Sequence, residues 1–398
     1  MLEKSAVLTA TAAKAKALSA IWTFPSVLLA AICIAWGAEA SQVLVSQGLA
    51  LAILAWLQTA PEFFVEGTIA WSKDITLMTA NFTGATRLLI GFGLPLVYFT
   101  SWFAHRKAGV KQKLTIKLEG EDAVPVIGML LPFLYGFVIV LKASLTVWDS
   151  VVLLIIYLTY LTVLQRIPSH GEEDIAEMER VPRWILTRTP TLRNSLIVFC
   201  FLGGGTILLF VVHPFVESMK GLAMLLGLSS YFFIQWVAPF MSEFPEFVSA
   251  WYWARRTGKV RMALMNPVSS AVAELTLLVA IIPIVYSISM GKITTIPFDW
   301  IHQEEILMTV LQATLGFLLL SDMRLRFWEA TLLAVLWFGQ IVAQVFNPYF
   351  PHINLKLAFN GFYVIWILTM IVNMVRGKYK PRVFAEFRKV LRDHVLKS

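Results

Sequence analysis

Long apolar runs are the feature that most limits how this chain can fold. Hydrophobic residues make up 58% of its 398 positions and charged residues only 15%, whereas soluble domains carry about 25% charged residues. A helix needs about 20 mostly apolar residues to cross a bilayer, and the sequence contains many such runs. The chain is therefore predicted to be an all-α polytopic protein, integral to a membrane.

Eleven membrane spans are predicted from the positions of these runs. They cover residues 20–37, 43–71, 75–103, 124–141, 147–165, 194–217, 222–253, 262–290, 305–321, 326–346 and 355–375. The second and seventh spans are too long for one straight crossing, and they contain Pro61 and Pro245. Proline removes a backbone donor and clashes with the preceding turn, so both spans are expected to be broken helices.

Loop charges predict the orientation in the membrane. Lysine and arginine concentrate in alternate segments, at 105–121, 166–193, 255–261 and 324–326 and after residue 375, while the other loops carry about one cation each. The positive-inside rule places the basic segments and the C-terminus in the cytoplasm and the N-terminus outside, an orientation with which Lys4, Lys14 and Lys16 disagree. The net charge of +8 is thus explained without a nucleic-acid partner, and the cell (inner) membrane is the expected location.

The basic linker 166–193 divides the chain near its middle. Five spans precede it, so a second five-span unit would be inverted, as in many secondary transporters. The predicted organisation is a first repeat at 1–165, the cytoplasmic linker, a second inverted repeat at 194–346, and an extra span with a basic tail at 347–398. The tail has the amphipathic pattern of a helix lying on an anionic inner leaflet.

An internal repeat supports this division. "WLQTAPEFFVEGTIAW" at 56–71 aligns with "FMSEFPEFVSAWYWAR" at 240–255, so that Pro61-Glu62 matches Pro245-Glu246. With nearly the same spacing, Asn81 matches Asn266 in the following span. Each half therefore has a hydrophobic helix broken at Pro-Glu, followed by a helix that opens near an asparagine.

These motifs resemble the two α-repeats of the calcium/cation antiporter superfamily, which includes the sodium/calcium exchangers. The family motif reads roughly G-T-S-L-P-E and then G-N-x-x-G-S-N, and the corresponding segments here are 57–62 with 80–86, and 241–246 with 265–271. The first glycine is replaced by Leu57 and Met241, and the last asparagine by Thr86 and Ala271. The resemblance implies cation exchange by alternating access.

Carboxylates inside the apolar runs give the chemistry of a candidate site. A charged group at the bilayer centre costs at least ~2.5–3.5 kcal/mol and normally faces a partner, a cavity or an ion, and Ca²⁺ binds six to eight oxygens. The predicted cation ligands are Glu62 and Glu246 at the centre, with Glu243, Glu274, Thr59, Ser242, Ser270, Asn81 and Asn266. The alternative is that the glutamates are structural groups, hydrogen bonded between helices.

Arg87 has no basic counterpart in the second half, where Val272 aligns. Arginine stays protonated at ordinary pH, so a buried Arg87 needs an acidic partner. Glu66, one turn beyond Glu62, has no assigned role, and a modulating Arg87–Glu66 ion pair that locks two helices is predicted. In the alternative, Arg87 reaches Glu62 and occupies the cation position itself.

Two functions follow from these features. The leading prediction is a secondary active antiporter that exchanges Ca²⁺ or another cation for Na⁺ or H⁺. The alternative is a transport-inactive protein with the same fold, serving as a structural subunit of a membrane complex. No nucleophile–base or nucleotide-binding motif is visible, so the chain is not expected to be an enzyme or to bind a covalent cofactor. Its expected partners are a small cation and the bilayer.

Overall fold

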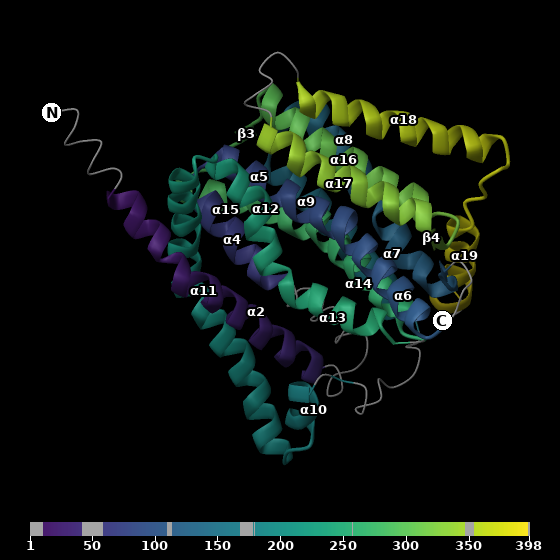
Figure 1. The fold of residues 1–398 in the computed structure, drawn as a ribbon, viewed down its shortest axis with the longest axis horizontal. Coiled ribbons are helices and arrows are strands. Elements are labelled where there is room, and N and C mark those ends of the chain that lie inside the picture. Colours follow the sequence, from purple (N-terminus) through teal and green to yellow (C-terminus); the bar gives the residue numbers. More distant parts are fainter. Residues whose placement is uncertain are drawn as a thin grey trace. The chain divides into compact units, whose positions relative to one another are not determined.

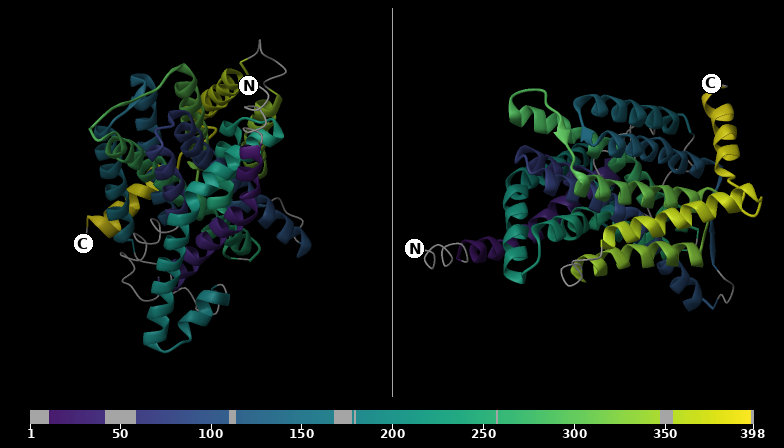
Figure 2. Two further views of the ribbon diagram at one scale, coloured as in Figure 1. Left: turned by 90° about the vertical axis from the view of Figure 1, so that its left-hand side faces the viewer. Right: turned by 90° about the horizontal axis from the view of Figure 1, so that it is seen from above.

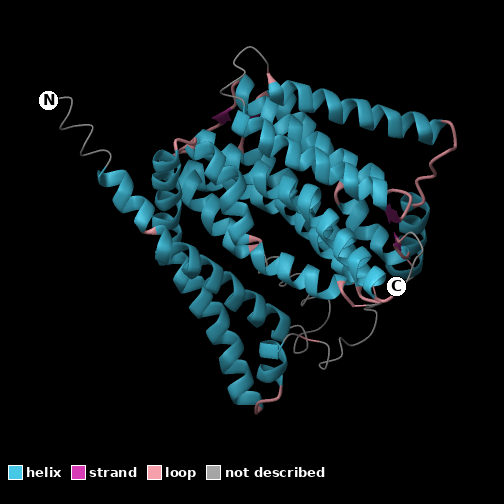
Figure 3. Ribbon diagram, viewed as in Figure 1, coloured by secondary structure: helices cyan, strands magenta, loops and turns pink. Residues whose placement is uncertain are grey.

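The computed structural model describes residues 11–41, 59–109, 114–167, 178, 180–256, 258–346 and 354–396. Helices make up almost all of it, joined by short loops and a few very short strands (Figure 3). Within these residues, nine helical stretches are long and apolar enough to cross a membrane: Thr11–Ser41, Ile75–Lys107, Gly120–Lys142, Val147–Gln165, Pro190–Leu226, Val260–Met290, Trp300–Leu320, Phe327–Phe346 and Leu355–Val375. The all-α polytopic class is confirmed, whereas the count of eleven spans is not.

The chain forms two compact units, and each draws on both halves of the sequence. Unit 1 comprises Met1–Asn81 and Pro168–Pro245, and unit 2 comprises Phe82–Ile167 and Glu246–Ser398. The predicted repeats are defined along the chain, whereas these units are defined by packing. The boundaries of the predicted repeats and linker stay a prediction.

Unit 1 is built around two long helices that pack side by side (Figure 1). Its helices are α2 (Ala20–Ser41), α4 (Ala60–Trp71), α10 (Arg180–Leu186), α11 (Pro190–Leu226) and α12 (Ser230–Ser242). A Cβ added at Gly204 of α11 would lie 2.9 Å from the carbonyl oxygen of Ala30 on α2. The glycine therefore permits the close approach of the two backbones.

Helix α11 corrects one predicted boundary. The sixth and seventh spans were expected to be separated at 218–221, but α11 continues through this segment to Leu226 and ends at Gly227, whose φ of 66° suits glycine. The charged residues that suggested a loop are accommodated within the helix. Glu217 accepts hydrogen bonds from Lys220 of the same helix and from Lys16, so charge in this segment does not interrupt the helix.

Unit 2 contains most of the remaining elements. Its helices are α6 (Leu94–Lys107), α7 (Ala123–Gly128), α8 (Leu130–Lys142), α9 (Val147–Gln165), α14 (Val260–Ala273), α15 (Val279–Met290), α16 (Trp300–Leu320), α17 (Phe327–Phe346), α18 (Leu355–Val375) and α19 (Val383–Val390), with the 3₁₀ turn η2 (Gly120–Asp122) and the π-helical turns η1 (Leu89–Gly93), η4 (Glu274–Leu278) and η6 (Leu391–Val395). Helices α5 (Ile75–Leu88) and α13 (Phe244–Ala254) each contain a unit boundary. Figure 2 shows α18, in yellow, beside α16 and α17, which it contacts.

Four short strands pair across the two halves of the sequence. The strands are β1 (Thr115–Lys117), β2 (Ser144–Leu145), β3 (Ile296–Pro297) and β4 (Arg324–Arg326). By element order β1 corresponds to β3 and β2 to β4. The antiparallel pairs are β1 with β4 and β2 with β3, so exchanging the halves turns one pair into the other. This is the pattern expected of two copies related by a two-fold axis.

Both Pro-Glu motifs lie where a helix begins. Helix α4 starts at Ala60 with Pro61 in its first turn, where the missing N–H leaves no hydrogen bond unmade. Helix α12 ends at Ser242, and α13 starts at Phe244 with Pro245 next. The seventh predicted span is therefore broken in the expected place. The first part of the second span, 43–58, lies outside the described residues.

The basic tail packs on the protein in unit 2. Helix α19 contacts α7 and η2, and its Val383 and Val390 are buried. The backbone N–H of Val383 donates to the carbonyl of Ser321 at 2.9 Å. Tyr379 donates to the carbonyl of Leu319, and burial raises the pKa of its hydroxyl. Phe384 of the face predicted to lie on the inner leaflet also contacts Phe317, so part of that face packs on protein.

Candidate functional site

The centre of unit 1 is a hydrogen-bonded group of acids. Glu62 and Glu66 lie one turn apart on α4, so both carboxylates share one helix face, and both are almost fully buried. Asn81 of α5 donates from Nδ2 to Glu62 Oε1 at 2.5 Å and to Glu66 Oε2 at 2.8 Å. One amide therefore holds two carboxylates from adjacent turns.

Helix α12 supplies the other side of this group. Its last residue, Ser242, donates from its hydroxyl to Glu62 Oε2. Glu243 follows in the break between α12 and α13 and is 1% exposed. Thr59, immediately before α4, is equally buried. Unit 1 thus brings together Glu62 with Asn81 and Ser242, three of the predicted ligands, and adds Glu66.

Several oxygens of this group lack a partner within the described residues. They are Glu66 Oε1, Asn81 Oδ1 and Glu243 Oε2, all buried and without a hydrogen bond. The described chain also gives Glu62, Glu66 and Glu243 no ion pair with a basic side chain. Burying a carboxylate without compensation is strongly unfavourable, so a proton or a bound cation would stabilise this group.

The donor set combines carboxylate, hydroxyl and amide oxygens. Among the described residues, no three His, Cys, Asp or Glu side chains are gathered closely enough to hold a metal ion. A hard cation here would need the hydroxyl, amide and backbone oxygens near the carboxylates to complete its shell. Hydroxyl and amide groups are present, in Ser242 and Asn81.

The predicted ligands of the second half lie in unit 2. Glu246 is in the first turn of α13, and Asn266 of α14 donates to its backbone carbonyl at 3.4 Å. Ser270 is buried one turn further along α14. Glu274 is fully buried and opens η4. The combination of these residues with Glu62 in one site stays a prediction.

Arg87 has an acidic partner that the sequence did not indicate. Its guanidinium, which is fully buried, forms an ion pair with Glu305 of α16. It also donates to Gln340 Oε1 at 3.0 Å and to the carbonyl of Thr83 at 3.1 Å. We expected Glu66 to compensate this charge, but Glu305 does so, and Glu66 binds Asn81. The predicted Arg87–Glu66 pair is therefore not needed to explain the buried arginine.

The extra span takes part in the network around Arg87. Lys356 of α18 pairs with the second oxygen of Glu305 at 2.5 Å. Tyr363, also on α18, donates to Gln312 Oε1 at 2.8 Å, and Gln312 donates to the backbone carbonyl of Arg87 at 2.8 Å. Sequence reasoning missed these residues. The available signal was Glu304-Glu305, an acidic pair at the start of a predicted apolar span.

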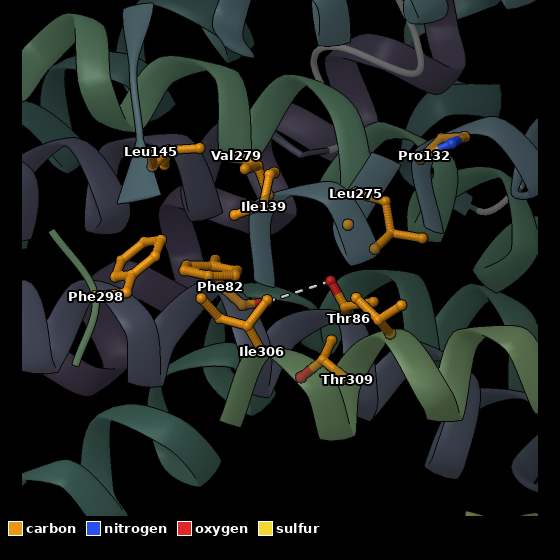
Figure 4. A pocket seen from close by; sticks show the side chains of 12 residues that line it. Phe82, Thr86, Pro132, Ile139, Leu145, Leu275, Val279, Phe298, Ile306 and Thr309 are labelled. Carbon is orange, nitrogen blue, oxygen red and sulfur yellow. Dashed lines mark hydrogen bonds between the residues drawn. The ribbon is translucent and has the colours of Figure 1, made fainter. Parts of the chain in front are cut away.

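A small cavity of unit 2 is apolar. It has a volume of about 30 Å³ and is lined mainly by aliphatic and aromatic side chains (Figure 4). Its two hydroxyls, those of Thr86 and Thr309, donate to backbone carbonyls of their own helices. Cavities of this character stay dry. The carboxylates of unit 1, rather than this cavity, have the chemistry to bind a cation.

Comparisons with known proteins identify the family and the fold of this chain. The family model for the sodium/calcium exchanger protein matches residues 14–165 and 196–346. The crystal structure of an H⁺/Ca²⁺ exchanger, CAX, is 29% identical and covers 96% of this chain and 91% of its own, with a TM-score of 0.83. A structure of the sodium-calcium exchanger NCX_Mj soaked with Na⁺ and Sr²⁺ is 18% identical, covers 84% of this chain and 99% of its own, and has a TM-score of 0.54, which indicates a shared fold. The comparison with curated proteins gave no match.

Proposed function

Because the chain belongs to the sodium/calcium exchanger protein family, we propose that it is a secondary active antiporter that exchanges Ca²⁺ or a similar divalent cation for protons by alternating access. The observation that carries this proposal is the buried group of unit 1, in which carboxylate and amide oxygens lack partners within the described residues. Such oxygens are the ligands that Ca²⁺ prefers. The likeness to an H⁺/Ca²⁺ exchanger over 96% of the chain favours protons as the counter-ion.

The proposed chemistry uses the buried carboxylates for both ions. A carboxylate out of water is compensated either by a proton or by a bound cation. Glu62, Glu243, Ser242, Thr59 and Asn81 would supply oxygens from unit 1. The second set would come from unit 2 and comprises Glu246, Glu274, Ser270 and Asn266. Binding of a cation would release protons from the carboxylates of both sets. Protons that bind to these carboxylates again would displace the cation.

The test is ion flux in proteoliposomes. An acidic interior should drive Ca²⁺ uptake together with proton efflux, whereas Na⁺ and K⁺ gradients should not. Mg²⁺ in place of Ca²⁺ tests selectivity between divalent cations. If a Na⁺ gradient drives Ca²⁺ uptake and a pH gradient does not, the counter-ion is Na⁺ and not the proton. Absence of flux under every gradient would instead favour a structural subunit without transport.

The proposed central ligands are tested by neutralisation. Glu62→Gln and Glu246→Gln should each abolish exchange while the protein still inserts and purifies as a folded species. Glutamine has nearly the same shape as glutamate, so a loss of flux reports the charge. The assignment is wrong if both single variants exchange Ca²⁺ at the parent rate.

A further inference from the structure

Glu66 lies inside the buried group of unit 1, at a position to which the family motif assigns no ligand. Its carboxylate shares the amide of Asn81 with Glu62, at 2.8 Å and 2.5 Å. It is fully buried, and its second oxygen, Oε1, has no hydrogen-bond partner in the described part of the chain. A carboxylate that only fastened Asn81 would need one oxygen, so its other oxygen is available to a ligand.

Asn81, which joins the two acids, offers a second oxygen without a partner among the described residues. The side-chain amide donates both of its hydrogens to the carboxylates, and its Oδ1 has no partner among the described residues. Turning the amide over exchanges its oxygen and nitrogen with little change in shape. Oδ1 would then point toward the two carboxylates, so that all three side chains present oxygen to the same place.

We infer that Glu66 is a further cation ligand, and that it makes the unit 1 group selective for divalent over monovalent cations. Two carboxylates on one helix face carry two negative charges, which match a divalent cation. Added to Glu62 and Glu243, a further carboxylate increases the negative charge of the group, which in a medium of low dielectric constant favours a divalent over a monovalent cation. This inference rests on the proposed function, because it concerns the same group of residues.

The experiment measures cation-dependent stabilisation of the purified full-length protein, separately from transport. Glu66→Gln removes the charge but keeps an oxygen that accepts from Asn81, so the hydrogen-bonded structure is preserved. The matched control is Glu217→Gln, which removes a carboxylate of unit 1 that pairs with Lys16 and Lys220. Thermal unfolding is followed against increasing Ca²⁺ and, separately, Na⁺.

Since ligand charge tunes Ca²⁺ affinity over orders of magnitude, Glu66→Gln should raise the Ca²⁺ concentration for half-maximal stabilisation at least ~10-fold. The response to Na⁺ should not change, and Glu217→Gln should match the parent. Glu66→Asp, which keeps the charge, should recover part of the Ca²⁺ response.

Three outcomes would overturn the inference. If Glu66→Gln responds to Ca²⁺ like the parent while Glu62→Gln does not, Glu66 is not a ligand, and the proposed antiport stands. Equal losses for Ca²⁺ and Na⁺ would show that Glu66 has a structural role without selectivity. A parent protein that shows neither flux nor Ca²⁺-dependent stabilisation would overturn both the inference and the proposed function.

Discussion

Glu305 is the acidic residue that pairs with both Arg87 and Lys356. It receives Arg87 on one oxygen and Lys356 on the other. If either base is removed, one ion pair remains. If Glu305 is removed, the side chains of Arg87 and Lys356 both lose this partner, and Arg87 is fully buried. The three side chains should therefore differ in how strongly they affect stability.

We expect Glu305→Gln to lower the thermal unfolding temperature more than Arg87→Met or Lys356→Met does. Removing one partner of a buried ion pair costs ~3–5 kcal/mol, because the other charge stays buried. Lys356 should have the smallest effect, since its side chain is 29% exposed and the Arg87–Glu305 pair survives its loss. Thermal unfolding of the purified variants measures this order.

The double variant Arg87→Met with Glu305→Gln is the control for this assignment. It removes the arginine together with its acid and should recover much of the stability that Glu305→Gln loses. Arg87→Met with Glu66→Leu should give no comparable recovery. A recovery confined to the Glu66 combination would restore the Arg87–Glu66 pair and contradict the assignment of Glu305.

The π-helical turns are the elements that sequence reasoning did not anticipate. Turn η1 starts at Leu89 and η4 at Glu274, two positions that align in the internal repeat. A π turn holds an extra residue and is often found at functional sites. Each turn therefore changes the direction of side chains along a helix that carries predicted ligands, and it does so at the same place in both halves.

Gly91 shows how closely η1 is packed. A Cβ at this position would lie 2.6 Å from Cβ of Trp337 on α17 and 2.6 Å from Nε2 of Gln312 on α16. Gly91→Ala should therefore destabilise the protein by roughly 1–3 kcal/mol, as overpacking of a core does. Thermal unfolding measures the loss.

The matched control is Gly361→Ala on α18, where a Cβ would meet nothing within 4 Å. Alanine favours a helix over glycine by roughly 0.5–1 kcal/mol, so this variant should be no less stable than the parent. Equal behaviour of the two variants would show that the space around Gly91 adjusts at little cost.

At the scale of the whole molecule, local signals in the sequence were the most reliable. Apolar runs and proline breaks depend on nearby residues, so they predicted the helical class and the break near Pro245. The boundary inside α11 was wrong because charges such as Glu217 are paired along and across helices. The partner of Arg87 was missed because Glu305 is distant in sequence. Helical spacing placed Glu62 and Glu66 on one face, but it could not place Asn81 between them.

Orientation in the membrane is tested by labelling. We propose that the C-terminus is cytoplasmic and that the loop before α16 is outside the cell. In a background with Cys33 and Cys200 replaced by serine, Ile293→Cys should react with an impermeant maleimide on intact cells. Leu396→Cys should react only after permeabilisation; both positions are well exposed in the structure. The opposite labelling pattern would invert the proposed topology.

The crossed strand pairs have a consequence for how the protein is made. Strand β1 is synthesised long before its partner β4, since Thr115 pairs with Arg326. At a translation rate of ≈5–20 residues per second, the ribosome needs roughly 10–40 s to reach that partner. The first half must therefore remain in the membrane with unpaired strands until the second half arrives. For the same reason, two half-chains produced together should complete each other, whereas neither half alone can close its strand pairs.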